Sequence, residues 1–317
     1  MLAFLQSELV PSIPLAEWTE SAVDWITDNF EWFFDPLDSA IDLVVGSLEY
    51  VLLASPALLM VAILGVIAFL LASWRVALFT VLGLVFVISL DLWEAAMQTL
   101  ALVLAATFVA LVIGIPIGII AAKSETVETI IRPILDVAQT MPAFVYLVPI
   151  VVLLGIGAGP ALIATVVFAM PPAVRLTMLG IQQVPKDTVE AAHAFGATSW
   201  QTLFKVELPL SLKTIMAGVN QVIMLSLSMV VIAGLAGAGG LGEPVVTGLS
   251  QLDVGISFVG GVGIVVIAIM LDRITRAMAK QDGGGGPRIF SRKKRPAADT
   301  SAGYGGGSGT DASTGGS

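Results

Sequence analysis

Apolar runs long enough to cross a lipid bilayer recur along this chain of 317 residues. Crossing the hydrocarbon core takes about 20 residues of helix, and lipid offers no partner for a free backbone polar group. The chain is 56% hydrophobic and only 12% charged, and its mean hydropathy is +0.94. These features predict an all-α polytopic membrane protein and exclude a water-soluble globular fold.

We expect about seven transmembrane helices. The predicted spans cover residues 56–73, 76–90, 97–122, 137–156, 160–180, 213–236 and 254–271. Only a very short linker around Trp74 and Arg75 separates the first two spans. Residues 56–92 are therefore two accessory helices or a re-entrant hairpin, whereas residues 93–276 form the core of the membrane domain.

The distribution of basic residues predicts the orientation of the chain. With seven spans and a cytoplasmic C-terminus, all 15 Lys and Arg residues fall inside the cell or at the inner end of a span. The opposite orientation would place all of them outside, against the positive-inside bias. We therefore expect the N-terminus outside and the C-terminus in the cytoplasm.

Residues 1–55 form an acidic segment that we expect on the extracytoplasmic side. The segment holds ten of the 24 acidic residues and no Lys or Arg, so it lacks the charged start of a signal peptide. Between residues 17 and 35, acidic and aromatic residues each recur every three or four positions, which predicts an amphipathic helix. Such a helix either lies on the outer membrane surface or binds another protein.

The sequence changes character near its C-terminus. Residues 277–317 include four consecutive glycines, the basic cluster "RKKR" at 292–295 and a Gly/Ser/Thr tail. This composition predicts a disordered cytoplasmic tail, because it offers too little apolar surface to offset the entropy of ordering. We expect the basic cluster to lie near anionic lipid of the inner leaflet.

Several kinds of chemistry are missing from the sequence. It has no cysteine, no Walker A phosphate loop, and no Cys/His cluster or H-E-x-x-H motif for a metal. The net charge of −9 does not favour a nucleic-acid partner. The single histidine, His193, is expected to be an ordinary solvated or packed side chain and not a general base. The stretch "GAGGLGEP" at 237–244 indicates a turn that lets backbones pack closely. The chain is not expected to be an enzyme or to hold a cofactor.

A polar, amphipathic island at 185–209 interrupts the apolar chain, between the fifth and sixth predicted spans. Pro185 can begin a helix that runs to about Phe195. Gly196 then stands where a helix end favours positive φ, and Thr198 with Gln201 has the spacing of a capping box for a second helix. Pro209 is expected to end that helix before the next span. The second helix should carry an exposed apolar ridge, which is typical of a protein contact, unless the hairpin packs only on its own membrane domain. The ridge is formed by Trp200, Leu203, Phe204 and Val206.

This island resembles the EAA loop of ABC importer permeases. The family pattern is E-A-A-x3-G-x9-I-x-L-P, and the chain departs from it only by a valine in place of the isoleucine. The resemblance implies a cytoplasmic coupling helix that docks on a separate ATPase subunit. The matching residues are Glu190, Ala191, Ala192, Gly196, Val206, Leu208 and Pro209.

Four further stretches resemble the permease of the glycine betaine/L-proline importer. They begin "RPILDVAQTMPAF" at 132, "AMPPAVRLTM" at 169, "IMAGVNQVIM" at 215 and "GGVGIVVIAI" at 260. The resemblance covers roughly residues 15–276, including the acidic N-terminal segment. It implies a multi-pass protein of the bacterial inner membrane that works with a second copy of itself and an extracytoplasmic substrate-binding protein. ATP and Mg would be bound by a pair of ATPase subunits, and the cargo would be a compatible solute used in osmoprotection.

Two of the predicted spans carry polar or helix-breaking residues, and we expect both to line the translocation path. Irregular backbone is tolerated at membrane depth where protein or a water-filled cavity satisfies it. The two aromatic rings in the fourth span could face a quaternary ammonium group. The alternative for all of these residues is hydrogen bonding and packing between helices. They are Gln139, Thr140, Pro142, Phe144 and Tyr146 in the fourth span and Asn220, Gln221, Ser226 and Ser228 in the sixth.

Two other functions remain open at this point. A secondary transporter driven by an ion gradient would need inverted repeats and an ionisable residue inside the membrane, neither of which is convincing here. An uncoupled channel for small solutes is the other possibility. Transport without any ATPase subunit would favour these alternatives.

Overall fold

The structure is a computed structural model, and it describes residues 14–281. All regular elements in this part of the chain are helices. Residues 1–13 lie outside the described residues. So does the predicted disordered tail, apart from residues 277–281, which belong to the last helix. The helices are α2 (Leu15–Leu53), α3 (Ala57–Leu71), α4 (Trp74–Ser89), α5 (Trp93–Lys123), α6 (Glu125–Thr140), α7 (Ala143–Leu154), α8 (Ala158–Gln182), α9 (Lys186–Ala194), α10 (Ser199–Thr202), the π-helical segment η1 (Leu203–Glu207), α11 (Leu208–Ser228), α12 (Val230–Leu235), α13 (Gly242–Gln251) and α14 (Val254–Gln281).

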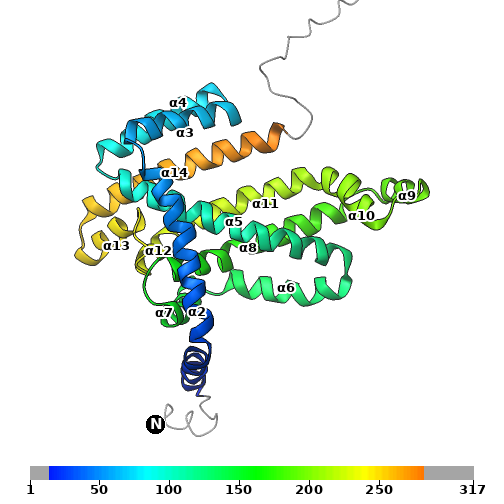
Figure 1. The fold of residues 1–317 in the computed structure, drawn as a ribbon, viewed down its shortest axis with the longest axis horizontal. Coiled ribbons are helices and arrows are strands. Elements are labelled where there is room, and N and C mark those ends of the chain that lie inside the picture. Colours follow the sequence, from blue (N-terminus) through cyan, green and yellow to red (C-terminus); the bar gives the residue numbers. More distant parts are fainter. Residues whose placement is uncertain (1–13, 282–317) are drawn as a thin grey trace, which may run out of the picture.

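The centre of the molecule is a bundle in which α8 packs against both α5 and α11, and α11 packs against α14 (Figure 1). Small residues let these helices approach closely, as is common where no hydrophobic effect drives association in lipid. A Cβ added at Gly118 of α5 would lie 2.7 Å from the Thr177 Cβ and the Val174 carbonyl oxygen of α8. Gly114, one turn earlier, would meet the Ala173 Cβ at 2.8 Å. This contact fixes α5 and α8 to one another.

Helix α2 crosses this bundle rather than running along it (Figure 1). The predicted helix over residues 17–35 is confirmed, but it continues without a break to Leu53. The second half packs against α5, α7 and α8, and it buries Ile41 and Val45 in the same apolar cluster as those helices. The first half leaves Trp18, Trp25 and other aromatic side chains exposed. The segment therefore has one half that is buried in the bundle and another half whose aromatic side chains are exposed.

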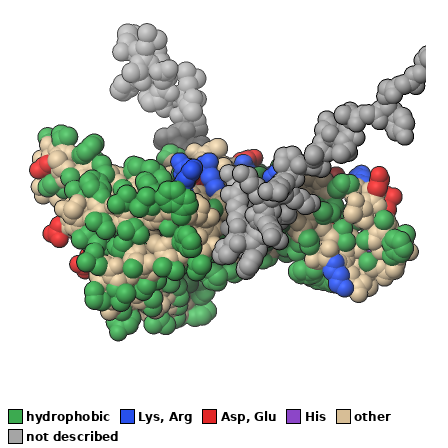
Figure 2. All heavy atoms as spheres, turned by 90° about the horizontal axis from the view of Figure 1, so that it is seen from above, with side chains coloured by type: hydrophobic (Ala, Val, Ile, Leu, Met, Phe, Trp, Pro, Cys, Tyr) green, Lys and Arg blue, Asp and Glu red, His purple; other side chains and the backbone are tan. Residues whose placement is uncertain are grey.

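Helices α3 and α4 form an antiparallel pair at the edge of the bundle, where α4 packs against α14. At 15 and 16 residues they fall just short of the roughly 17 residues at which a helix can span the bilayer. Hydrophobic side chains cover much of the surface seen from this side of the molecule (Figure 2). Leu58, Phe69, Leu82 and Phe86 are among those exposed, which fits a surface in contact with lipid.

Four helical stretches in the described residues are long and apolar enough to span a membrane, and up to six if each bent pair of helices counts as one span. Helices α5, α8 and α14 agree with the predicted spans 97–122, 160–180 and 254–271. The predicted span 137–156 is not one straight helix, because α6 and α7 meet at an angle of 94° around Met141 and Pro142. The polytopic all-α fold is confirmed, whereas the number of seven spans stays a prediction.

Candidate functional site

The polar island forms a helix–turn–helix at the end of the bundle opposite α12 and α13 (Figure 1). Helix α9 follows Pro185 and has no buried residue, so it projects from the bundle. At its end Gly196 adopts a φ of +84°, as the sequence predicts. The Ala197 N–H donates to the Ala192 carbonyl and the Gly196 N–H to the His193 carbonyl, which is the Schellman pattern of helix termination.

The predicted capping box of the second helix is also confirmed. The Thr198 Oγ1 accepts from the Gln201 N–H at 3.3 Å, and the Gln201 Oε1 accepts from the Thr198 N–H at 2.9 Å. Two backbone donors at the start of α10 are satisfied in this way. The turn at Gly196 and this cap together fix the angle at which the chain re-enters the bundle.

The expectation that Pro209 ends the second helix is wrong. Helix α10 passes into the π-helical segment η1 and then directly into α11, so that residues 199–235 form one long helical stretch. Pro209 stands in the first turn of α11, where a missing N–H is tolerated. The wider π turn, in which the Leu208 N–H bonds to the Leu203 carbonyl, accommodates the proline ring without a break.

Three aromatic side chains are exposed on the loop. Trp200 and Phe204 stack with ring centroids 5.6 Å apart, and they are 70% and 57% exposed. Phe195, beside the turn, is 93% exposed. The predicted ridge is thus only partly correct, because Leu203 is buried and Val206 is half-buried. We call Phe195, Trp200 and Phe204 the loop aromatic patch.

The remaining residues of the EAA pattern lie on either side of this patch. Glu190 and Ala191 are exposed on α9 and Ala192 is half-buried. Leu208 is half-buried and Pro209 is exposed at the start of α11. The structure therefore brings the two ends of the pattern into one helix–turn–helix, although they are 14 or more positions apart in the chain.

One pair of residues at this site was missed by the sequence analysis. Glu207, the last residue of η1, is only 4% exposed, and its carboxylate forms an ion pair with the ammonium group of Lys123 at the end of α5. A buried charge is expensive unless it is paired, so this contact ties the loop to α5. The signal was present in the sequence as a glutamate between Val206 and Leu208, but its partner is 84 positions away and no local pattern points to it.

The predicted path residues of α6 and α7 surround the bend between these helices. Pro142 stands at the bend, Gln139 is half-buried, and Thr140 donates through Oγ1 to the Asp136 carbonyl at 2.8 Å. Phe144 is 52% exposed, whereas Tyr146 is half-buried among apolar neighbours. The break predicted from the polar and proline residues is therefore present.

The four predicted path residues of α11 divide into two kinds. The Asn220 Oδ1 accepts from Thr275 Oγ1 of α14 at 2.7 Å, and the buried Ser226 lies 3.5 Å from Thr107 Oγ1 of α5. These two side chains therefore hydrogen-bond between helices, which was the alternative to lining the translocation path. Gln221 and Ser228 are exposed, although the Ser228 hydroxyl bonds back to its own helix. Helix α8 packs against both α6 and α11 and so joins the two predicted sets.

The glycine-rich turn before α13 is held by α5. The Gly240 N–H donates to the Gln98 Oε1 at 2.9 Å, and the Leu241 N–H donates to the Thr99 Oγ1 at 2.8 Å. The Gln98 amide also donates to the Glu49 carboxylate of α2 at 3.1 Å. The predicted close packing at this turn is confirmed, and it reaches the acidic N-terminal helix.

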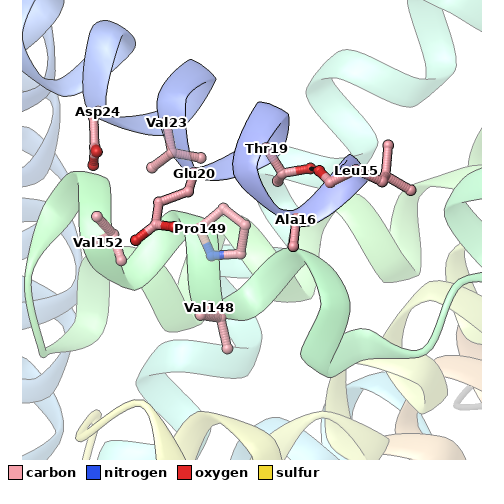
Figure 3. A pocket seen from close by; sticks show the side chains of 9 residues that line it. All are labelled: Leu15, Ala16, Thr19, Glu20, Val23, Asp24, Val148, Pro149 and Val152. Carbon is pink, nitrogen blue, oxygen red and sulfur yellow. Dashed lines mark hydrogen bonds between the residues drawn. The ribbon is translucent and has the colours of Figure 1, made fainter. Parts of the chain in front are cut away.

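A shallow groove of about 600 Å³ separates the first turns of α2 from α7 (Figure 3). Val148, Pro149 and Val152 of α7 form its apolar wall. Glu20 and Asp24 extend from α2 toward that wall (Figure 3). The groove lies at the half of α2 that leaves its aromatic side chains exposed.

Comparison with known proteins identifies the family. Residues 114–281 match the model of the family described as "Binding-protein-dependent transport system inner membrane component". The chain is 46% identical over 276 residues to the glycine betaine/proline betaine transport system permease protein ProW of Escherichia coli (strain K12), covering 87% of this chain and 78% of that protein. It is 48% identical over 267 residues to the glycine betaine transport system permease protein OpuAB of Bacillus subtilis (strain 168), covering 84% and 95%.

The fold is also found among solved structures. A chain of the MetNI methionine ABC transporter, in an inward-facing conformation, is similar with a TM-score of 0.55. The similarity covers 61% of this chain and 96% of that chain at 22% identity, so it concerns the fold alone. With the family match and the two permeases, these findings show that the chain is a multi-pass inner-membrane component of the binding-protein-dependent transport system family.

Proposed function

We propose that the chain is the permease subunit of an ATP-driven, binding-protein-dependent importer of compatible solutes such as glycine betaine and proline. The observation that carries this proposal is the identity of 46–48% over 84–87% of the chain to permeases named for glycine betaine. That similarity covers both the loop and the helices around the predicted path. The cargo would be used in osmoprotection.

The helix–turn–helix is the part of the chain that we propose contacts the ATPase subunit. Helix α9 projects from the bundle and the loop aromatic patch is exposed on the segment that follows, so both are free to contact another protein. Clusters of exposed apolar side chains usually mark such contacts. We assign this contact to a separate ATPase subunit that binds ATP and Mg, while this chain performs no hydrolysis itself. Glu190, Gly196 and the rest of the EAA pattern would transmit closure of the ATPase pair to the helices of the path.

The complete importer would contain two copies of this chain, two ATPase subunits and an extracytoplasmic substrate-binding protein. The distribution of Lys and Arg supports placing the loop and the C-terminus in the cytoplasm and the N-terminus outside. In this orientation α12, α13 and the crossing helix α2 are on the outer side, where the binding protein would deliver its cargo.

Reconstitution in lipid vesicles tests this function. The purified chain is combined with an ATPase subunit and a substrate-binding protein from the same organism, and uptake of labelled glycine betaine and proline is measured. Uptake should require both ATP and the ATPase subunit. Uptake without the ATPase would instead support a secondary transporter or a channel. Failure of betaines and proline beside robust uptake of a sugar or a metal ion would reject the assigned cargo.

A further inference from the structure

Helices α6 and α8 are joined by an ion pair that the helix–turn–helix does not use. The Arg175 guanidinium of α8 donates to the Asp136 Oδ1 of α6 at 2.6 Å. Both side chains remain accessible in the single chain, at 38% for Arg175 and 66% for Asp136. Arg175 is seven residues before the end of α8, which places it about 10 Å inside the helix at a rise of about 1.5 Å per residue.

Lipid is an unsuitable environment for these two charges. Ionisable side chains at membrane depth face the interior of a bundle or a water-filled cavity, because exposure to hydrocarbon is costly. Three more polar residues of α6 extend the same stripe, since Glu128, Arg132, Asp136 and Thr140 are spaced by four positions and so lie along one side of the helix. Gln182 of α8 joins this stripe by donating to the Glu128 carboxylate at 2.9 Å. A continuous polar seam therefore runs along α6 and α8.

The opposite side of α6 has a different character. Ile130 and Ile134 are 58% and 57% exposed, and they are suited to lipid. Helix α6 is thus apolar on one side and charged on the other. The charged side needs either water or a second copy of the chain against it, and both are present where a translocation path forms between two permease subunits.

We propose that Arg175 and Asp136 form a binding site in the translocation path for a zwitterionic solute. Arg175 takes the carboxylate of the solute, and Asp136 faces its substituted ammonium group. The proposal rests on the proposed function and deepens it, because it names the residues of this chain that recognise the cargo.

The chemistry of the pair suits a zwitterion better than a simple ion. A guanidinium is always charged and presents a planar fork of donors that matches a carboxylate. A quaternary ammonium offers no N–H, so a carboxylate can attract it by charge alone. When a zwitterion enters, one ion pair is replaced by two and the site stays neutral. A lone cation or anion would leave one of the two protein charges without a partner.

Cysteine labelling tests the environment of the seam, and it requires no transport. The chain has no cysteine, so Asp136→Cys and Ile134→Cys can each be labelled without background. In the assembled complex in lipid vesicles, a water-soluble methanethiosulfonate should modify Asp136→Cys at least about tenfold faster than Ile134→Cys, because thiolate formation needs water. Equal rates at the two positions would overturn the proposal.

Uptake by charge-neutral variants tests the role of the pair. Arg175→Gln and Asp136→Asn should each lower glycine betaine uptake by about tenfold or more, the loss expected for a charge-assisted hydrogen bond. ATP hydrolysis stimulated by the binding protein should change little in the same vesicles. The control is Arg276→Gln, which breaks an arginine–aspartate pair within α14, outside the seam between α6 and α8, and should leave uptake unchanged.

A double variant separates recognition from structure. If the pair only held α6 against α8, replacing both charges together in Arg175→Met/Asp136→Met would restore uptake, since apolar side chains can substitute for an ion pair in packing. The proposal expects uptake to stay low in this variant, and restored uptake would overturn it. These outcomes are judged against an ATP-driven unmutated complex, so a failure of the proposed function itself would be recognised first by the absence of that uptake.

Discussion

Glu207, in the π-helical segment after the turn at Gly196, is paired with Lys123, the last residue of α5. The glutamate is buried and the lysine is about half exposed. The pair connects the helix–turn–helix to α5, and α5 in turn packs tightly on α8 through Gly114 and Gly118. These contacts therefore connect the loop to two helices of the bundle.

Removing the lysine should destabilise the chain. In Lys123→Met the Glu207 carboxylate loses its counter-charge, and a buried polar group without a partner costs about 1–3 kcal/mol. The double variant Lys123→Met/Glu207→Met should recover much of this loss, because no charge is then left buried. Thermal unfolding in detergent measures both variants.

Arg276→Met is the control for that measurement. It removes the exposed cation of a pair that joins Arg276 to Asp272, one turn earlier in α14, and such a pair contributes at most about 1 kcal/mol. If Lys123→Met costs no more than this control, the ion pair does not stabilise the loop. If the double variant is as unstable as the single one, the loss comes from packing rather than from the unpaired charge.

Gly196→Val should uncouple ATP hydrolysis from uptake while leaving the chain inserted. No heavy atom lies within 4 Å of a Cβ placed at Gly196, so the penalty comes from the backbone and not from a clash. A φ of +84° costs a residue with a Cβ about 1–2 kcal/mol, more for a β-branched side chain, so the turn would open and α9 would shift. Uptake and ATPase activity are compared in reconstituted vesicles.

Gly46→Val provides the matched comparison for the turn. Gly46 also has open space around its Cβ position, but it lies within helix α2 and does not have a positive φ. This variant should keep its coupling. Normal ATP-driven uptake in Gly196→Val would remove the basis for assigning a coupling role to the turn.

Local features of the loop were predictable from the sequence, whereas long-range contacts were not. The positive φ at Gly196 and the capping box at Thr198 each follow from residues a few positions apart. The continuation through Pro209 was missed, because a π turn depends on how the chain is held at both ends. The partner of Glu207 was missed for a similar reason, since packing of α5 against the loop decides it.

The same distinction applies to α2 and to the path. Acidic and aromatic residues that each recur every three or four positions predicted the helix in the first half of α2, but burial of Ile41 and Val45 depends on helices far along the chain. The bend at Pro142 was predicted from proline and polar residues. The sequence could not predict which polar residues of α11 bond to neighbouring helices. Asn220 and Gln221 carry the same amide group, and only the packing of α14 against α11 decides that Asn220 is bonded and Gln221 is exposed.

Trp200→Ser should weaken binding of the ATPase subunit without destabilising this chain. The indole is 70% exposed and stacks on Phe204, so its loss removes little buried surface from the free chain. An aromatic anchor at the centre of an interface contributes about 2 kcal/mol or more, equivalent to about 30-fold in affinity. Titration of the ATPase against immobilised permease measures this change.

Trp74→Ser serves as the control for the loop tryptophan. Trp74 is 61% exposed but begins α4, at the edge of the bundle formed by α3 and α4. Its removal should leave ATPase affinity unchanged. Equal affinities for the two variants would show that the loop aromatic patch is not the contact surface.

The exposed first half of α2 can be held at the membrane in two ways. Its aromatic side chains, including Trp18, Trp25 and Trp32, would enter the interface by apolar burial, which salt does not screen. Its acidic residues would instead meet basic groups of a partner protein, and that attraction weakens with salt. Quenching of tryptophan fluorescence by brominated lipid, at low and high salt, distinguishes the two. Salt-insensitive quenching is expected for aromatic anchoring.

Labelling of α2 in intact cells tests the orientation of the whole chain. Ser21 and Ser39 are exposed on α2, and the absence of native cysteine gives no background for Ser21→Cys or Ser39→Cys. A membrane-impermeant thiol reagent should label both in intact cells, because residues 1–55 contain no Lys or Arg and are placed outside. Ser199→Cys, exposed at the start of α10, should react only after the cells are opened. Labelling of α2 only in opened cells would reverse the topology, and the number of spans or the placement of α3 and α4 would then have to change.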